Sequence, residues 1–275
     1  MLRTVDASLA DVLQVFVEVE NLRARLLPMS SPDSNPNPSP DSDSNKREEV
    51  HFYPGDKLLL YYVNDKIVLR AEAWGGPSKR KPRLPGESIA AGPTLPGTFI
   101  IDHVESYRTS TWDWSKVRWG TRIRKSQRRS TQAEYELSSG KWASLTRDFG
   151  IGAKDIETAH RSLFGYDKFP DRWIFNDFGP IAVRYYRDRN ANRQRDASEP
   201  LMGQMLHTTP SNEAQWIRYP EDASKVELAP SHGCIHIKPI DRDAFLEAGA
   251  FRPGMTLIVF RYHEHFTGKP ESESR

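Results

Sequence analysis

Residues 231–236 read Ser-His-Gly-Cys-Ile-His, and Cys234 within them is the only cysteine of a 275-residue chain. A nearby imidazole stabilises the thiolate, which is the form of cysteine that attacks carbon. In an extended segment side chains alternate between two faces, so His232, Cys234 and His236 are predicted to point to the same side. This arrangement predicts a reactive thiol rather than a buried structural cysteine.

A second signal lies upstream, where His207 and Thr208 follow the apolar run 201–206. The base that activates the thiol is expected either from the segment of Cys234 itself or from His207. Gly233 has a separate role, because a residue without a side chain lets a substrate carbonyl approach the backbone. The amides of Gly233 and Cys234 are therefore candidates for an oxyanion hole.

Metal binding is an alternative, because cysteine and histidine are both good ligands for zinc or copper. The candidate ligands are His207, His232, Cys234 and His236. Three of them stand at i, i+2 and i+4 on one strand, where neighbours are about 7 Å apart and close a tetrahedron poorly. We therefore predict no metal at these residues, and keep a metal-binding site as an alternative.

The motif resembles that of the L,D-transpeptidases of bacterial peptidoglycan: a histidine, then further along Ser or Thr, any residue, Gly, Cys, an apolar residue, and Asn or Arg. Residues 231–235 match without a gap. Two departures are visible: the stretch from His207 to Ser231 is longer than usual, and His236 stands where the family has Asn or Arg. The roles implied by the resemblance are Cys234 as nucleophile, His207 as general base, Thr208 as the residue that orients the base, Gly233 in the oxyanion hole, His232 in shaping the site, and Ser231 and His236 in substrate binding.

The resemblance also implies a mainly β fold, namely a β-sandwich of mixed sheets with a few short helices. The residues agree with that expectation in several places. The elements expected are a hairpin over 57–63 and 66–74 that turns at Asn64-Asp65, a Thr-Pro-x-Gly-like segment over 93–101, strands over 173–177 and 181–186, a helix over 241–247 that stops at Gly249, and a last strand over 255–262.

A long insertion is expected at about residues 105–170, because the segment exceeds what a minimal domain of this kind needs. It contains tryptophans and a basic cluster, namely Trp112, Trp114, Trp119, Trp142, Arg118, Arg122, Arg124, Lys125, Arg128 and Arg129. Aromatic faces and guanidinium groups suit a lid that grips a glycan or an anionic polymer. The alternative is a solvated loop with a few packing tryptophans.

The predicted domains are an amphipathic helix over 1–29, a flexible linker over 30–48, the catalytic domain over 49–266 and a disordered tail over 267–275. Apolar residues at near-helical spacing carry the first prediction, namely Leu9, Leu13, Phe16, Val19 and Leu26. The helix is expected either to dock on the catalytic domain or to bind a partner or secretion carrier. Ser, Pro, Asp and Asn dominate the linker.

Composition limits the partners. A net charge of +2 and 37% hydrophobic residues suit one core of ordinary size. We expect no nucleic-acid binding, because no motif presents the basic cluster to a groove. We expect no stable membrane insertion either, because the sequence lacks a run of about eighteen apolar residues. Acidic residues interrupt the first thirty positions, so a cleavable signal peptide is not predicted.

The reaction implied by the resemblance is acyl transfer on peptidoglycan tetrapeptide stems through a Cys234 thioester. An amine acceptor then gives a 3–3 cross-link or an exchange, whereas water gives L,D-carboxypeptidase hydrolysis. The implied place of action is the periplasm or cell envelope. Because no cleavable signal peptide is predicted, the chain is expected either to be a processed form or to pass through the cytoplasm before export by a route that is independent of Sec. The implied reaction requires no metal and no organic cofactor. One alternative is a secreted interbacterial effector that turns the same chemistry against a rival's cell wall, and another is a metal-binding or non-catalytic peptidoglycan-binding module.

Overall fold

The structure is a computed structural model that describes residues 47–83 and 89–268. The predicted helix over 1–29, nearly all of the predicted linker over 30–48 and most of the predicted tail over 267–275 lie outside the described residues. The described residues belong to one compact unit.

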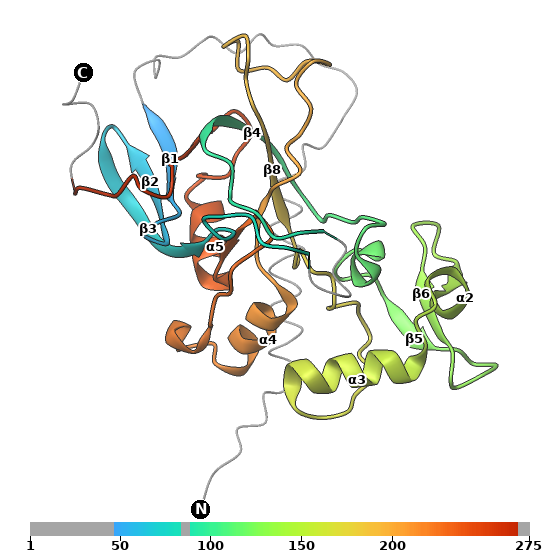
Figure 1. Ribbon diagram of the computed structural model, residues 1–275. Helices are drawn as coiled ribbons and strands as arrows, with labels where there is room; N and C mark the ends of the chain where they lie inside the picture. Colours follow the sequence, from blue (N-terminus) through green and yellow to red (C-terminus); the bar gives the residue numbers. More distant parts are fainter. Residues whose placement is uncertain (1–46, 84–88, 269–275) are drawn as a thin grey trace, which may run out of the picture. The chain divides into compact units, whose positions relative to one another are not determined.

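Most of the strands belong to one closed sheet (Figure 1). They are β1 (Glu48–Tyr53), β2 (Leu58–Val63), β3 (Lys66–Trp74), β4 (Gly97–Glu105), β8 (Ala182–Tyr186), β9 (Leu206–His207), β10 (Ile235–Ile237) and β11 (Thr256–Val259). The order is β1-β11-β4-β8-β9-β10-β3-β2, closing back on β1. Pairs β1–β11 and β9–β10 are parallel and the others are antiparallel. The predicted mainly β fold with mixed pairing is confirmed, and one closed sheet takes the place of separate sheets.

The predicted hairpin forms β2 and β3. Its turn residues Asn64 and Asp65 have φ values of 49° and 61°, as a two-residue turn between twisted strands requires. All of β2 except Val63 is buried, whereas burial alternates along the second half of β3. The period-two pattern therefore places the end of β3 against the core, next to β10.

The main core fills the inside of the closed sheet. Phe52, Leu59, Phe99 and Leu257 contribute to it from four strands, and Phe245 contributes from helix α5 (Pro239–Glu247). Burial of each such side chain stabilises the fold by about 1.5 to 3 kcal/mol. The predicted helix after the cysteine is thus present, and it packs its apolar face on the sheet.

Residues 106–175, between β4 and β8, form what we call the insertion module. Its elements are η1 (Asp113–Lys116), β5 (Ile123–Lys125), β6 (Ala133–Glu136), β7 (Trp142–Ser144), α2 (Leu145–Phe149) and α3 (Ala153–Phe164). The three strands make a separate sheet. A second core that includes Ile123, Leu145, Ile156 and Trp173 fills the module. The segment is therefore a folded unit with its own core.

The prediction of a strand over 173–177 is wrong, whereas the neighbouring strand over 181–186 is confirmed as β8. Residues 173–177 run without regular structure. The Trp173 N–H donates to the Thr121 carbonyl at 2.8 Å, and the Asn176 side chain donates to the carbonyls of Tyr107 and Val117 at 2.9 and 2.8 Å. These bonds tie the segment to the insertion module instead of the barrel.

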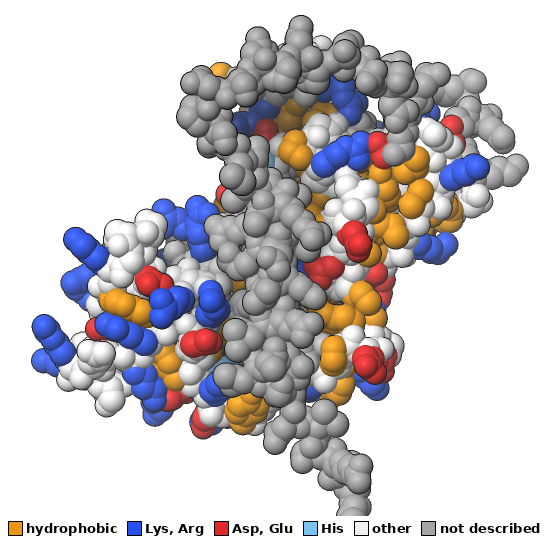
Figure 2. Space-filling view, turned by 180° about the vertical axis from the view of Figure 1, so that it is seen from behind, with side chains coloured by type: hydrophobic (Ala, Val, Ile, Leu, Met, Phe, Trp, Pro, Cys, Tyr) orange, Lys and Arg blue, Asp and Glu red, His pale blue; other side chains and the backbone are white. Residues whose placement is uncertain are grey.

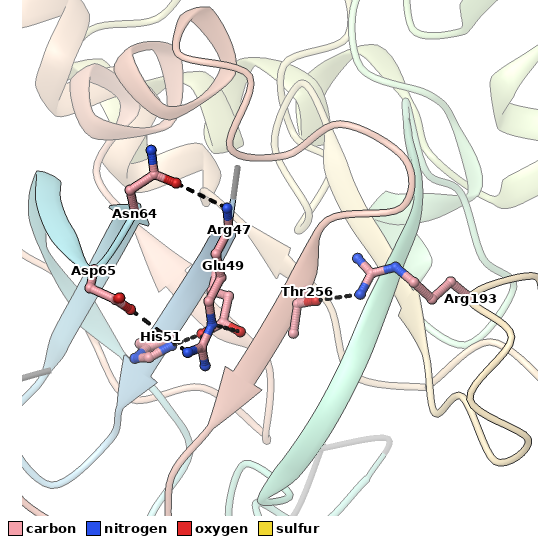
Figure 3. A network of polar contacts seen from close by, with 7 residues as sticks. All are labelled: Arg47, Glu49, His51, Asn64, Asp65, Arg193 and Thr256. Atoms are coloured by element: carbon pink, nitrogen blue, oxygen red, sulfur yellow. Dashed lines mark hydrogen bonds and ion pairs between the residues drawn. The ribbon is translucent and has the colours of Figure 1, made fainter. Parts of the chain in front are cut away.

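Polar contacts fix the outer surface of the barrel around β1 and β11 (Figure 3). Arg47 donates to Glu49 at 3.1 Å, and the His51 ring contacts the same carboxylate at 2.9 Å. Arg193, from the charged loop before β9, donates to the Thr256 hydroxyl at 3.1 Å. The first described residue and this long loop are therefore both anchored to the sheet.

Candidate active site

A cavity of about 850 Å³ lies between the barrel and the insertion module. On the barrel side its lining includes His207, Ser231, His232, Cys234 and His236, and on the module side it includes Trp112, Trp114, Ala159, Ser162 and Leu163. The structure thus brings five of the seven predicted site residues to one cavity. Thr208 and Gly233 are buried behind its wall.

The parallel pairing of β9 and β10 brings the two sequence signals together. His207 is paired with His236, and their ring centroids are 4.8 Å apart. At the start of β10, the Ile235 N–H donates to the Met205 carbonyl at 2.8 Å. Residues 231–236 alternate between buried and partly exposed. His232, Cys234 and His236 are the partly exposed ones and share the cavity, as predicted.

His207 is held as a neutral imidazole. Its side chain is buried, and its Nδ1 is 2.6 Å from the Thr208 carbonyl oxygen. Because a carbonyl only accepts hydrogen bonds, Nδ1 carries the proton and Nε2 keeps a lone pair, which is the form of a general base. Burial lowers the pKa of His207 to about 3, and the nearby His236 acts in the same direction.

Cys234 is partly exposed and packs against the apolar side chains of Phe178, Ala182 and Met205. These surroundings raise the pKa of its thiol to about 11, although a hydrogen bond with the Met205 backbone and the charge of Arg184 act in the opposite direction. Thiol and imidazole are therefore both neutral at pH 7. Attack by the sulfur requires a proton transfer in the same step.

The loop that carries the thiol is fixed from within. The Gly233 N–H donates to the Ser231 hydroxyl at 2.9 Å, and that hydroxyl donates to the Cys234 carbonyl at 2.5 Å. Gly233 has φ +128°, and a Cβ there would lie 2.4 Å from Nε2 of Gln204. Glycine is thus required at this position by both conformation and space. The Gly233 amide, a predicted oxyanion-hole donor, is engaged inside the loop.

Gln204 is a site residue that sequence reasoning missed. Its side chain donates to the Pro93 carbonyl and accepts from the Leu95 N–H, both at 2.9 Å. It therefore connects the predicted Thr-Pro-x-Gly-like segment to Gly233. Nothing in the spacing of the sequence indicated this, because the partners lie more than a hundred residues apart.

The insertion module supplies an aromatic wall. The Trp112 ring meets the His232 ring edge to face, with centroids 5.2 Å apart. Trp114 also lines the cavity and stacks on Trp173 in the core of the module. The Trp142 ring instead lies against the Arg124 guanidinium, whose Cζ is 4.0 Å from the centroid of the ring. Two of the four predicted tryptophans thus reach the cavity.

Basic side chains gather on the insertion module, at the left of Figure 2. Several members of the predicted basic cluster are paired with acids. The pairs are Arg122–Glu136 at 3.2 Å, Arg124–Glu134 at 2.8 Å and Lys125–Glu157 at 2.6 Å. These three carboxylates neutralise part of the positive charge.

Within residues 47–83 and 89–268, no three His, Cys, Asp or Glu side chains are grouped so as to hold a metal ion. In the same part of the chain, none of the helices is both long enough and apolar enough to cross a bilayer.

No protein-family model and no curated protein matches the chain. Among solved structures it is similar to an L,D-transpeptidase from Xylanimonas cellulosilytica, with 10% identity and a TM-score of 0.35 over 82% of this chain and 65% of that one. Mycobacterium tuberculosis L,D-transpeptidase 1 gives 12% identity and a TM-score of 0.30, over 78% of this chain and 62% of that one. The chain thus spans less than two thirds of the length of either. The function proposed below therefore rests on the geometry of the cavity and not on this distant similarity.

Proposed function

We propose that the chain is a cysteine acyltransferase that acts on peptidoglycan tetrapeptide stems, either as an L,D-transpeptidase or as an L,D-carboxypeptidase. The observation that carries the proposal is the placement of Cys234 and His207 on one cavity by the β9–β10 pair. His207 presents a neutral imidazole whose Nδ1 proton is already bound by Thr208. A thiol nucleophile, a base and a group that orients the base are the parts that acyl transfer requires.

In the first half-reaction, Nε2 of His207 takes the proton from the thiol as Sγ bonds to the carbonyl carbon of the L-centred diaminopimelate residue. In the tetrahedral intermediate, the bond between that carbon and the D-Ala nitrogen then breaks. The nitrogen accepts the proton from His207, and D-Ala leaves as the free amino acid. The product is a thioester on Cys234. In the second half, the nitrogen of an acceptor amine or the oxygen of water bonds to the thioester carbon while His207 takes a proton from it. The C–S bond then breaks, and the sulfur takes that proton back from His207 as the free thiol.

The oxyanion of both intermediates needs a donor on the cavity side of the thiol. We assign this role to the backbone N–H of Cys234, because Ser231 engages the Gly233 N–H. Loss of one such donor costs about 3 to 4 kcal/mol of transition-state stabilisation. Gly233 is still essential in this assignment, and the reason is its close packing against Gln204.

Peptidoglycan as substrate implies action in the periplasm or cell envelope. The aromatic wall of Trp112 and Trp114 is proposed to contact the part of the stem that extends beyond the scissile bond. His236 takes the place of the family's Asn or Arg, and its Nδ1 contacts the Ala229 carbonyl at 2.9 Å. In this proposal His236 shapes the donor side of the cavity.

In the decisive experiment, the protein is incubated with a defined tetrapeptide stem, with and without an acceptor amine. The masses of the protein and of the products are then measured by mass spectrometry. We expect a thioester adduct on the wild type, release of D-Ala, and either a dimeric or a hydrolysed stem. Cys234→Ala is expected to form no adduct while remaining folded. A folded wild type that binds the stem without adduct or product would instead define a binding module.

A further inference from the structure

Behind His207, away from the cavity, lies a chain of buried polar side chains that the proposed reaction does not use. Thr208 is fully buried, Glu213 is 5% exposed and Arg242 is 3% exposed. The Thr208 hydroxyl donates to Oε1 of Glu213, and the Arg242 guanidinium pairs with the same oxygen. A continuous chain of contacts therefore runs from the general base to a buried ion pair.

Thr208 is clamped from two sides. On one side, Glu213 accepts a hydrogen bond from the Thr208 hydroxyl. On the other lies Gly179, where a Cβ would come within 2.2 Å of the Thr208 hydroxyl and 3.1 Å of its carbonyl oxygen. This carbonyl is the one that binds Nδ1 of His207. A shift of the Thr208 backbone would move the acceptor that fixes the tautomer of the base, and the packing on both sides of Thr208 opposes such a shift.

Glu213 and Arg242 come from two helices that meet beneath the site. Glu213 lies in the first turn of α4 (Pro210–Arg218), which begins at Pro210 after the capping Thr209. Arg242 lies in α5 and also donates to Asp243 at 2.7 Å. A carboxylate in the first turn of a helix is favoured by the helix dipole. Glu213 and Arg242 thus connect α4 and α5, the helices that follow β9 and β10, to the Thr208 hydroxyl.

A buried ion pair is poor evidence of a stabilising role, because desolvation offsets much of the attraction between the charges. What the pair supplies here is direction, because a carboxylate held by a guanidinium accepts the hydrogen bond of a neighbouring hydroxyl from a fixed position. Here that group is the Thr208 hydroxyl. An apolar pair of the same volume packs as well but leaves the hydroxyl without an acceptor.

We propose that Glu213 and Arg242 are positioning residues for the general base, which act through Thr208 to keep the His207 proton on Nδ1 and the Nε2 lone pair aimed at the thiol. This inference rests on the proposed function in one respect, namely that His207 is the base. It adds two residues that contact neither the substrate nor the thiol.

The test uses three single variants and one double variant of the full chain. Thr208→Val removes the hydroxyl and leaves the ion pair intact, Thr208→Ser keeps the hydroxyl, and Glu213→Gln removes the charge at nearly constant shape. We expect Thr208→Val and Glu213→Gln to lower kcat about 10- to 100-fold at unchanged KM, because a misplaced base slows chemistry and not binding. Thr208→Ser is expected to retain most of the activity.

The double variant Thr208→Val/Glu213→Gln is expected to be no slower than the slower single variant, because both changes act on the same contact between Thr208 and Glu213. Wild-type kcat in folded Glu213→Gln, or multiplied effects in the double variant, would overturn the proposal. If Glu213→Gln fails to fold, Thr208→Val against Thr208→Ser still decides it. Glu48→Gln is the matched control, since Glu48, on β1, pairs with Arg252 and does not line the cavity.

A second readout needs no peptidoglycan. Iodoacetamide alkylates Cys234: an S–C bond forms, iodide leaves and the thiol proton passes to His207. We expect the rate between pH 5 and 9 to fall in Glu213→Gln toward that of His207→Asn. If this order holds while no stem reacts, the positioning role stands and the substrate assignment fails. If stems react but Glu213→Gln is alkylated as fast as the wild type, the positioning role is wrong and the proposed function stands.

Discussion

The two walls of the cavity are built from different interactions. The barrel wall fixes His207 through Thr208, Glu213 and Arg242, by hydrogen bonds and a buried charge pair. The module wall presents Trp112 and Trp114, which are held by aromatic packing. Hydrogen bonds fix direction, whereas apolar packing supplies area with little directional preference. We therefore expect changes in the barrel wall to alter kcat and changes in the module wall to alter KM.

The largest expected effect is that of His207→Asn in the barrel wall. The variant is expected to lower kcat about 10²- to 10⁴-fold, the usual contribution of a general base, with KM little changed. Steady-state kinetics on a defined stem measures both constants. The wild type is expected to show a broad plateau between acidic and alkaline pH, because the pKa of His207 is about 3 and that of Cys234 about 11.

The controls for this prediction are His232→Asn and His236→Asn, which change the other two histidines that line the cavity. Each is expected to reduce kcat far less than His207→Asn does. A greater loss of kcat in either control would move the role of base from His207 to that residue.

Gly179→Ala tests the packing behind the barrel wall. Gly179 has φ +62°, and its added Cβ would collide with the hydroxyl of Thr208. We expect the free energy of unfolding to fall by about 2 to 4 kcal/mol, from backbone strain plus overpacking. Urea denaturation measures the loss, and the kcat of the folded variant is expected to fall as well.

Gly140→Ala is the matched control in the insertion module. Its φ is +75°, but nothing lies within 4 Å of the added Cβ. It therefore carries the backbone strain alone, at about 1 kcal/mol. Equal losses in the two variants would contradict the clamp on Thr208.

The parts of the site that follow a local pattern were predictable. The period-two alternation of residues 231–236 places His232, Cys234 and His236 on one face, and Asn64-Asp65 marks a turn that twisted strands favour. These signals depend on neighbours in the chain. They required no knowledge of which distant segments meet.

The remaining parts depend on distant contacts. Glu213 and Arg242 look like ordinary surface residues of two short helices, and only the packing of α4 near α5 buries them together. The strand expected over 173–177 fails for the same reason, because Asn176 bonds to carbonyls that lie far away in the chain. A single sequence carries no signal for such partners.

A smaller effect concerns the pH dependence of stability. The folded pKa of His207 is about 3, below the unfolded value near 6.5, so protonation favours the unfolded state. The stabilising contribution is complete above pH 6.5 and is lost as the pH falls toward 3. At pH 5 the loss is about 2 kcal/mol. Urea titrations at pH 7, 6 and 5 are expected to show a shallower decline in His207→Asn than in the wild type.

The insertion module contains a comparable group, since burial lowers the pKa of His160 in α3. His160→Gln is therefore expected to reduce the same decline, but without lowering kcat. Identical pH profiles of stability in the wild type and in both variants would contradict the assignment of buried neutral histidines.

The smallest expected effect is that of Trp112→Ala in the module wall. The change removes an aromatic surface from the cavity together with its edge contact to His232. Such contacts contribute about 0.5 to 1.5 kcal/mol, so KM for the stem is expected to rise about 2- to 13-fold while kcat stays near the wild-type value. Trp142→Ala, which changes a tryptophan of the same module outside the cavity, is expected to leave both constants unchanged. A fall in kcat comparable to that of His207→Asn would show that the module wall also positions the reacting groups, and the division between the two walls would no longer hold.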